Sequence, residues 1–174
     1  MRFFANGPVL PDELLTARDE GRVIFFCGAG VSRARAGLPG FFGLAEKVVA
    51  DLVAKPDGAA RRLLDAARAQ EPIAGVGGLV PADRIFGLLE REFTVSEVRR
   101  SVARALRPKR GVDLSAHRAL IDLATGTDGQ VRLVTTNFEL LFERAAPGVR
   151  SSSPPALPDP RRERAFTGIV HLHG

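Results

Sequence analysis

The chain has 174 residues, 45% of them hydrophobic, and a formal net charge of +5. This length is enough for one ordinary domain with a sizeable core. No run of about eighteen apolar residues occurs, which argues against a transmembrane helix, and the first residues break their apolar run too early for a secretory signal. The single cysteine, Cys27, excludes an internal disulfide and a multi-cysteine zinc site. We therefore expect a cytoplasmic protein without membrane contact.

Basic residues form two groups along the chain, which raises the question of nucleic-acid binding. The groups are Arg99, Arg100, Arg104, Arg107, Lys109 and Arg110, and then Arg161, Arg162 and Arg164. Acidic residues are interspersed elsewhere, and the chain has no tyrosine or tryptophan on which bases stack. We expect solvated helix faces rather than a nucleic-acid groove.

The first predicted elements are a short helix and a strand. Residues 12–20 read as a helix, with Asp12 as candidate N-cap and Gly21 as the residue that ends it. Residues 23–27 form an apolar run rich in β-branched and aromatic side chains, which is typical of a parallel strand covered on both faces. Cys27, at the end of this run, is expected to be a buried small hydrophobe rather than a nucleophile.

A glycine-rich turn follows the strand at once. Gly28, Ala29 and Gly30 leave little side-chain bulk, so backbone N–H groups can approach a ligand closely. A helical pattern begins past Pro39, and strand, glycine turn and helix together are typical of phosphate binding. The dinucleotide fingerprint is incomplete, because Arg33 stands at its last small-residue position and no acidic ribose ligand follows at the expected distance. A dehydrogenase is therefore not expected, and the alternative is a tight turn that binds nothing.

A block of helices is predicted between this turn and the next strand. The periodic segments are 59–70, 82–92, 94–107 and 114–124. Thr94 or Ser96 is the expected cap of the third. The segment 71–81, with three glycines and two prolines, is a candidate hinge. We expect the extra helices to form a small subdomain or lid at about 54–128, beside the nucleotide pocket.

The second informative stretch lies at 131–143 and predicts a short strand followed by a helix that begins near Phe138. Residues 135–137 then lie at the carboxyl end of the strand, where open parallel sheets bind their ligands. The alternative is that Thr136 or Asn137 simply caps the next helix.

The end of the sequence predicts one more buried strand, after an exposed proline-rich loop at 146–164. The strand is formed by Ile169, Val170 and Leu172. His173 is favoured over His171 as the candidate site residue, because it ends the strand, as Asn137 nearly does. His117, inside a predicted helix, is expected to be structural.

Three motifs resemble the sirtuin superfamily. G-A-G-V-S at 28–32, followed by G-L-P-G-F at 37–41, resembles its NAD-binding loop. T-T-N-F-E at 135–139 resembles its T-x-N motif, and H-L-H-G at 171–174 resembles its H-G motif.

Departures from the deacylase pattern refine this resemblance. Four residues separate Ser32 from Gly37 where deacylases usually have three, Gly40 replaces an acidic residue, and a four-cysteine zinc module is missing. The chain is therefore more similar to the divergent SIR2-like domains of bacterial NAD hydrolases, many of them in antiviral defence.

The resemblance implies an α/β fold with a Rossmann-like parallel sheet, the SIR2/DHS-like NAD-binding fold, and an inserted helical subdomain. It implies NAD as substrate, no metal, and cleavage of the nicotinamide–ribose bond to give nicotinamide and ADP-ribose. Asn137 would hold the ribose or position water, and His173 would be the general base. The cofactor-binding residues implied are Gly28, Ala29, Gly30, Ser32, Pro39, Phe41 and Thr136. The alternatives are NAD-dependent protein deacylation and a module that senses NAD or ADP-ribose without turnover.

SIR2-like domains continue past the H-G motif with further strands, so the resemblance, from about residue 23 to 174, covers the front part of such a domain. We expect a fragment of a longer protein or a truncated product with an incomplete NAD pocket. The expected partners beside NAD are a further copy of the chain or a separate sensor region or protein.

Overall fold

A computed structural model describes residues 5–70, 82–159 and 166–173. Its described part is mixed α/β, with a four-stranded, all-parallel sheet and eight helices. The chain divides into two compact units: Met1–Ala36 with Gly111–Gly174, called here the sheet unit, and Gly37–Arg110, called the helical unit. The α/β class expected from the sequence is confirmed.

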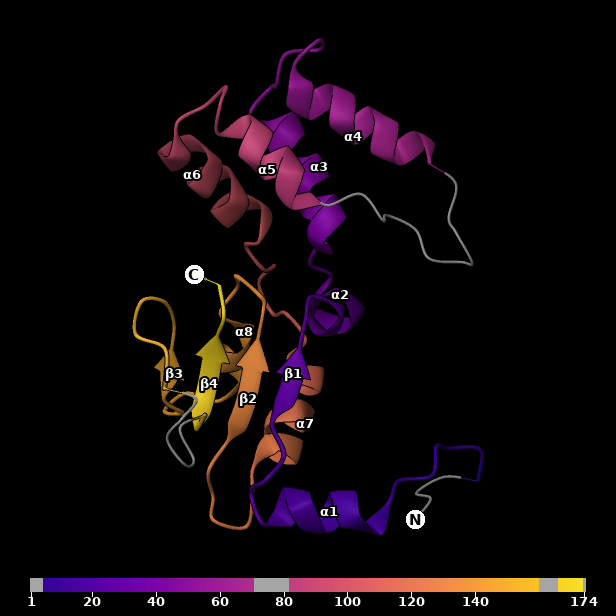
Figure 1. Ribbon diagram of the computed structural model, residues 1–174, viewed down its shortest axis with the longest axis vertical. Helices are drawn as coiled ribbons and strands as arrows, with labels where there is room; N and C mark the ends of the chain where they lie inside the picture. The colour runs from indigo at the N-terminus through magenta and orange to yellow at the C-terminus, as the bar shows by residue number, and fades with distance from the viewer. Residues whose placement is uncertain (1–4, 71–81, 160–165, 174) are drawn as a thin grey trace. The chain divides into compact units, whose positions relative to one another are not determined.

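The sheet unit is built on the strands β1 (Phe25–Cys27), β2 (Arg132–Thr135), β3 (Ser151–Ser152) and β4 (Gly168–His171). Their spatial order is β1-β2-β4-β3 (Figure 1). Cys27, Thr135 and His171 are register partners across β1, β2 and β4, so these three strands end at one edge of the sheet.

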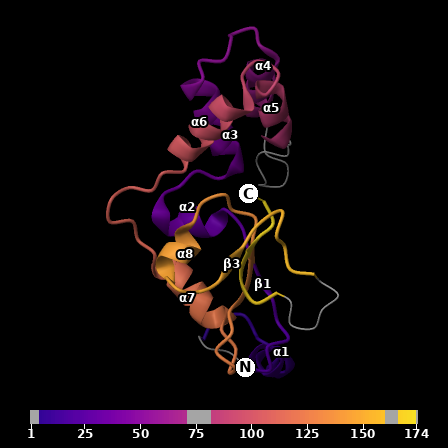
Figure 2. The ribbon, with the colours of Figure 1, turned by 90° about the vertical axis from the view of Figure 1, so that its left-hand side faces the viewer.

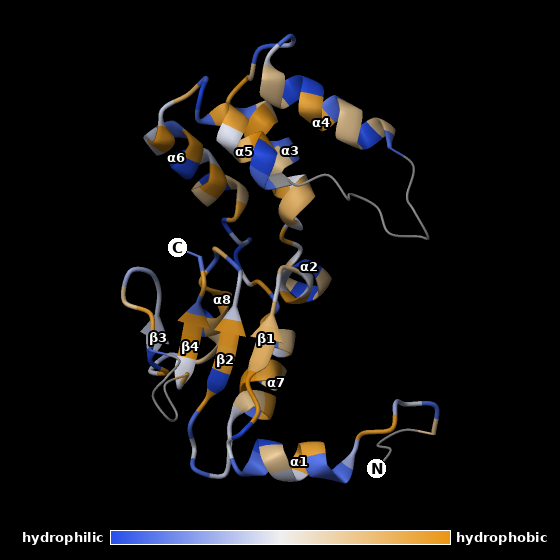
Figure 3. Cartoon of the chain, in the orientation of Figure 1, coloured by the Kyte–Doolittle hydropathy of each residue, from blue (hydrophilic) through white to orange (hydrophobic). Residues whose placement is uncertain are grey.

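Four helices belong to the sheet unit: α1 (Asp12–Asp19), α2 (Gly30–Ala36), α7 (Ser115–Ala124) and α8 (Leu141–Ala145). α7 and α8 pack on one face of the sheet (Figure 2). The buried core between them consists of Cys27, Ile121, Ala124, Val131, Leu133, Phe142 and Ile169. Strands β2 and β4 are buried along their whole length, and each has two apolar residues at its centre (Figure 3).

Strand β1 does not match its prediction. The sequence indicates a strand covered on both faces, but Phe26 is 69% exposed and Ile24, just before the strand, is 42% exposed. The reason is that β1 lies at the edge of the described sheet, and alternation turns Phe26 away from the face that α7 and α8 cover. Cys27 is buried as predicted, and burial raises the pKa of its thiol.

The helical unit contains α3 (Phe41–Asp51), α4 (Ala59–Ala69), α5 (Ala82–Leu89) and α6 (Val95–Ala105). Their cluster of buried side chains is Leu44, Ala45, Val48, Val49, Ala54, Ala60, Leu64, Ile85, Leu89 and Val98. The unit spans Gly37–Arg110 rather than 54–128, because α3 packs against α5 and α6 whereas α7 packs on the sheet.

Most predicted helices form with ends shifted by a few residues, and two elements were not predicted. Helix α2 replaces part of an expected turn, and β3 forms inside the expected loop at 146–164. The candidate cap Asp12 is not the N-cap of α1, because Pro11 holds that position and Asp12 begins the helix. Gly21 does follow the C-cap, with a φ of 71°.

The basic group between Arg99 and Arg110 is exposed, as predicted. The second basic group at 161–164 and the candidate hinge at 71–81 lie outside the described residues. Among the helices described, none has the length and apolar character needed to cross a membrane.

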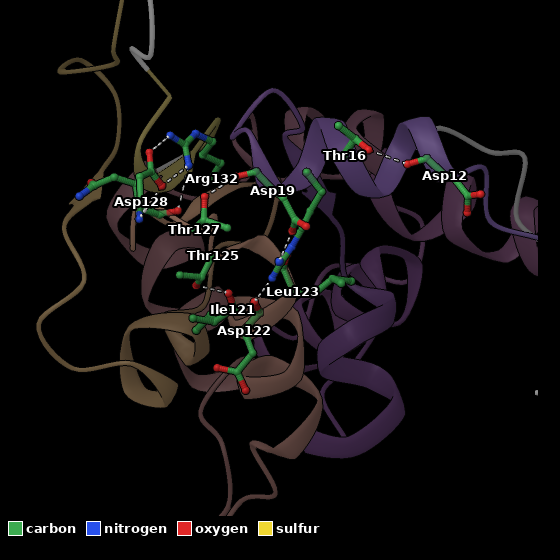
Figure 4. A network of polar contacts seen from close by, with 12 residues as sticks. Asp12, Thr16, Asp19, Ile121, Asp122, Leu123, Thr125, Thr127, Asp128 and Arg132 are labelled. Carbon is green, nitrogen blue, oxygen red and sulfur yellow. Dashed lines mark hydrogen bonds and ion pairs between the residues drawn. The ribbon is translucent and has the colours of Figure 1, made fainter. Parts of the chain in front are cut away.

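Helix α1 is fastened to the end of α7 by side-chain hydrogen bonds to backbone carbonyls (Figure 4). Arg18 donates from Nε to the carbonyl of Leu123 at 3.0 Å and from Nη2 to that of Asp122 at 3.0 Å. These carbonyls belong to the last turn of α7, where carbonyl groups have no amide four residues on within the helix to donate to them. That of Asp122 also accepts from the Thr125 amide at 3.3 Å. The arginine therefore caps one helix from another.

Candidate functional site

The segments that follow β1, β2 and β4 leave the sheet at the same edge. The amide of Thr136 donates to the carbonyl of Cys27 at 3.2 Å, and the amide of Leu172 donates to the carbonyl of Thr135 at 2.9 Å. The glycine turn after β1, the Asn137 segment after β2 and His173 after β4 therefore share one edge of a parallel sheet. Such edges carry the ligand sites of open α/β sheets.

The glycine turn is open. Gly28 and Gly30 are exposed and Ala29 is half-buried. A Cβ built on Gly30 would meet no atom of the structure within 4 Å, and one on Gly28 would meet only the Thr136 hydroxyl, at 3.7 Å. Neither glycine is among the described residues with positive φ. Within the described structure, neither packing nor backbone strain accounts for glycine at these two positions.

Asn137 lies in a buried polar cluster formed with Ser32 and Glu139. Its side-chain Nδ2 donates to Glu139 Oε1 at 2.8 Å and lies 3.4 Å from Ser32 Oγ. The Ser32 hydroxyl donates to the same carboxylate oxygen, and the amide of Leu141 donates to the other at 2.8 Å. The exposed fractions of Asn137, Ser32 and Glu139 are 5%, 2% and 8%. The Glu139 carboxylate thus accepts three hydrogen bonds, from Asn137, Ser32 and Leu141, and holds the Asn137 side chain in place.

His117 completes this cluster from α7. Its Nε2 lies 3.1 Å from Ser32 Oγ, and its ring meets Phe142 edge-on at 4.9 Å between centroids. Because the Ser32 proton goes to Glu139, the serine oxygen accepts from Nε2–H. Burial lowers the pKa of His117, against the opposing charges of Glu139 and Asp113, which favours the neutral ring. The prediction that His117 is structural agrees with its full burial.

His171 is also buried, with 3% of its surface exposed. Its Nδ1 lies 3.0 Å from the backbone carbonyl oxygen of Asn137, and its Nε2 lies 2.7 Å from Glu143 Oε1 on α8. The Ser151 hydroxyl donates to the same Glu143 oxygen at 2.6 Å.

The pKa values of this pair move in opposite directions. The hydrogen bond with Glu143 raises the pKa of His171, and burial opposes that rise. Burial alone would raise the pKa of Glu143, but the hydrogen bonds from His171 and Ser151 outweigh it and lower that pKa.

His173 lies beyond the end of β4 and is exposed. Its ring is tilted by 31° against that of Phe138, with 6.0 Å between the centroids. Thr136 is exposed as well. The strand ends at His171 and does not include Leu172, which the sequence had placed in it.

The remaining two predicted residues belong to the helical unit. Phe41 begins α3, and its ring stacks on Phe86 of α5 at 5.6 Å. Pro39 lies half-buried beside Gly43. The structure therefore brings Gly28, Ala29, Gly30, Ser32, Thr136, Asn137 and His173 to one edge of the sheet unit and places the other two in the helical unit.

From the sequence, no site role was assigned to three residues of this region: Glu139, His171 and Glu143. Glu139 stands two residues after Asn137, within a stretch already singled out, and an acidic residue so close was a usable signal. The contact between His171 and Glu143 has no local signal in the sequence, because it joins residues far apart in the chain. In the described part of the chain, no group of three or more His, Cys, Asp or Glu side chains is arranged to hold a metal ion.

One relative is found among curated proteins. The chain is 32% identical, over 183 aligned positions, to the uncharacterized protein y4cA of Sinorhizobium fredii. The match covers 100% of this chain but 14% of the relative, so the chain spans a small part of that protein's length. No protein-family model matches the chain. No solved structure matches it either.

Proposed function

We propose that this chain hydrolyses NAD⁺ at the nicotinamide–ribose bond, within a Rossmann-like sheet of the SIR2-like kind. The proposal combines the motif resemblance with the placement of the glycine turn, Asn137 and His173 at one sheet edge. The water adds to the ribose carbon as the bond to the nicotinamide nitrogen breaks, and the products are nicotinamide, ADP-ribose and a proton.

The observation that carries the proposal is the open glycine turn. Glycine costs about 0.5–1 kcal/mol relative to alanine in a regular element, and the space around Gly30 would accept a Cβ. A ligand that approaches the backbone closely would explain why glycine occupies these positions. The amide of Gly30, at the start of α2, has no i−4 partner within its helix, which suits contact with the substrate.

Asn137 supplies the acceptor next to this turn. Its Nδ2 is directed to Glu139 and Ser32, so Oδ1 is the atom that remains for a ribose hydroxyl or the attacking water. A fixed amide costs no reorganisation when the reaction occurs, which is the advantage of a buried, prearranged group.

His173 supplies the base. Its ring is exposed beyond β4 and can take the proton of the attacking water. The same exposure favours a second candidate function, NAD binding without turnover, because an effective base is usually oriented by a neighbouring group.

The substitution Gly30→Ala tests the glycine turn. The added methyl meets no protein atom, so we expect unchanged or slightly higher thermal stability, together with a rise in KM for NAD of about tenfold. Nicotinamide release measured against NAD concentration gives KM, and a thermal melt gives the stability.

The matched control is Gly87→Ala, at a glycine of α5 that also has open space around it. It should leave KM unchanged. If Gly30→Ala leaves KM unchanged as well, the glycine turn does not hold the substrate.

A further inference from the structure

The ring of His171 joins the Asn137 segment to helix α8. It contacts the backbone carbonyl of Asn137 through Nδ1 and the Glu143 carboxylate through Nε2, and all three groups belong to the sheet unit. His171 takes no direct part in the proposed reaction. Its neighbour two positions on, His173, has a different environment at the surface.

The proton count of this contact is informative. A carbonyl oxygen only accepts hydrogen bonds, so Nδ1 must carry a hydrogen, and an ionised Glu143 also accepts, so Nε2 must carry one too. The arrangement is complete when the ring is an imidazolium. A neutral ring would turn a lone pair toward one of the two oxygens.

We propose that His171 is a positioning residue, whose ring fixes the backbone of Asn137 and thereby the direction of the Asn137 side chain. This proposal rests on the proposed function, since Asn137 is assigned there to the ribose or the water. His171 itself does not touch the substrate; it acts through Asn137.

The charged groups around the His171 ring determine how its protonation depends on pH. Glu143 faces it from α8, and Glu139 acts on it from the segment before α8. Its register partner on β2 is Thr135, and β3 consists of two serines, so these two strands bring no titratable group opposite it.

The pH range of the intact pair follows from the two directions of shift. The folded pKa of His171 is raised above 6.5, so its contribution is complete below pH 6.5 and is lost as the pH rises through the folded value. The folded pKa of Glu143 is lowered below 4.5, so its contribution is complete above pH 4.5 and is lost as the pH falls through the folded value.

Two conservative substitutions separate positioning from a purely structural role. In His171→Asn the amide nitrogen replaces Nδ1 and still reaches the Asn137 carbonyl, whereas in His171→Gln it replaces Nε2 and reaches Glu143 instead. We expect kcat for nicotinamide release to fall about threefold or less in His171→Asn and at least about thirtyfold in His171→Gln, with KM little changed. Ser151→Ala, which alters a neighbour of Glu143 only, is the control and should keep the wild-type kcat.

A third variant, Glu143→Gln, tests the proton count. Its amide donates to Nε2, so a neutral ring satisfies both contacts. We expect the wild-type kcat to decline at alkaline pH through an ionisation above pH 6.5, and this decline to be absent in Glu143→Gln. An identical alkaline decline in both proteins would overturn the assignment.

Amide hydrogen exchange of residues 136–141 provides a readout that needs no enzymatic turnover. Exchange should be faster in His171→Gln than in His171→Asn at equal thermal stability. If wild-type protein releases no nicotinamide, the proposed function fails, and the exchange difference still decides whether His171 positions the segment. Equal exchange in the two variants, or equal losses of kcat, overturns the proposal.

Discussion

The guanidinium of Arg132 lies buried at the start of β2, with 4% of the residue exposed. It bonds the Asp128 carboxylate through two nitrogens, at 3.0 and 2.5 Å, and the carbonyl of Gln130 at 3.1 Å (Figure 4). The hydrogen bonds that Arg132 donates to Asp128 raise the pKa of Arg132 above its ordinary value. A Cβ on Gly21 would lie 2.6 Å from Arg132 Cζ, so Gly21 leaves the space in which the guanidinium sits.

Gly21→Ala should therefore destabilise the fold more than Gly129→Ala. The two glycines have nearly the same φ, 71° and 72°, but Gly129 has nothing within 4 Å of the added carbon. In both variants an alanine in the left-handed backbone conformation costs about 1–2 kcal/mol of stability. Gly21→Ala adds about 1–3 kcal/mol from steric crowding, because the hydrogen bonds of Arg132 prevent its side chain from moving away from the new methyl group. Urea unfolding measures both, and equal losses would contradict this account of Gly21.

Single residues of the candidate site differ in how far the sequence predicts them. Asn137 was identified because it follows a strand within a motif, and its place at the sheet edge agrees with that. Ser32 was predicted to contact NAD, and its hydroxyl lies buried against Glu139 and His117. Glu143 could not be identified, because only the tertiary fold brings it to His171.

Among the helices, α6 has the most complete start signal. Thr94 forms a capping box with Glu97: its hydroxyl oxygen accepts from the Glu97 amide at 3.3 Å, and its own amide donates to the Glu97 carboxylate at 2.9 Å. The sequence left Thr94 and Ser96 as alternatives, and the structure selects Thr94.

Thr94→Ala should lower the free energy of unfolding by about 1 kcal/mol, because first-turn amides lose their acceptor. Ser96→Ala, one residue inside the helix at an exposed position, is the matched control and should change stability by less than about 0.5 kcal/mol. Thermal or chemical unfolding compares the two. A larger loss in Ser96→Ala would contradict the assignment of the cap.

The elements that were not predicted have weak local patterns. The buried residues of α2 are Ser32 and Ala36, four positions apart, and a polar and a small residue give no apolar periodicity. Strand β3 is two serines, and only pairing with β4 makes it a strand. Strand β1 has a strong apolar pattern, yet the pattern does not tell an edge strand from a central one.

At the scale of the whole molecule, the sequence predicts both parts but not the border between them. Helix α3 looks like the crossover helix of a glycine-turn unit, whereas its apolar face packs in the helical unit. Helix α7 looks like the end of the helical block, whereas it covers the sheet. Amphipathic periodicity identifies a buried face without identifying its partner.

The central claim, that this sheet edge hydrolyses NAD⁺, is tested most directly by incubating the purified chain, beside a form extended to the natural stop codon if the gene continues, with NAD and quantifying nicotinamide and ADP-ribose. We expect equal amounts of the two products from the wild type, and a loss of at least about a hundredfold in kcat for Asn137→Ala and for His173→Ala. NAD binding by the variants, measured as a thermal shift, should persist. Wild-type protein that binds NAD without releasing nicotinamide, or variants that turn over at the wild-type rate, would contradict the claim.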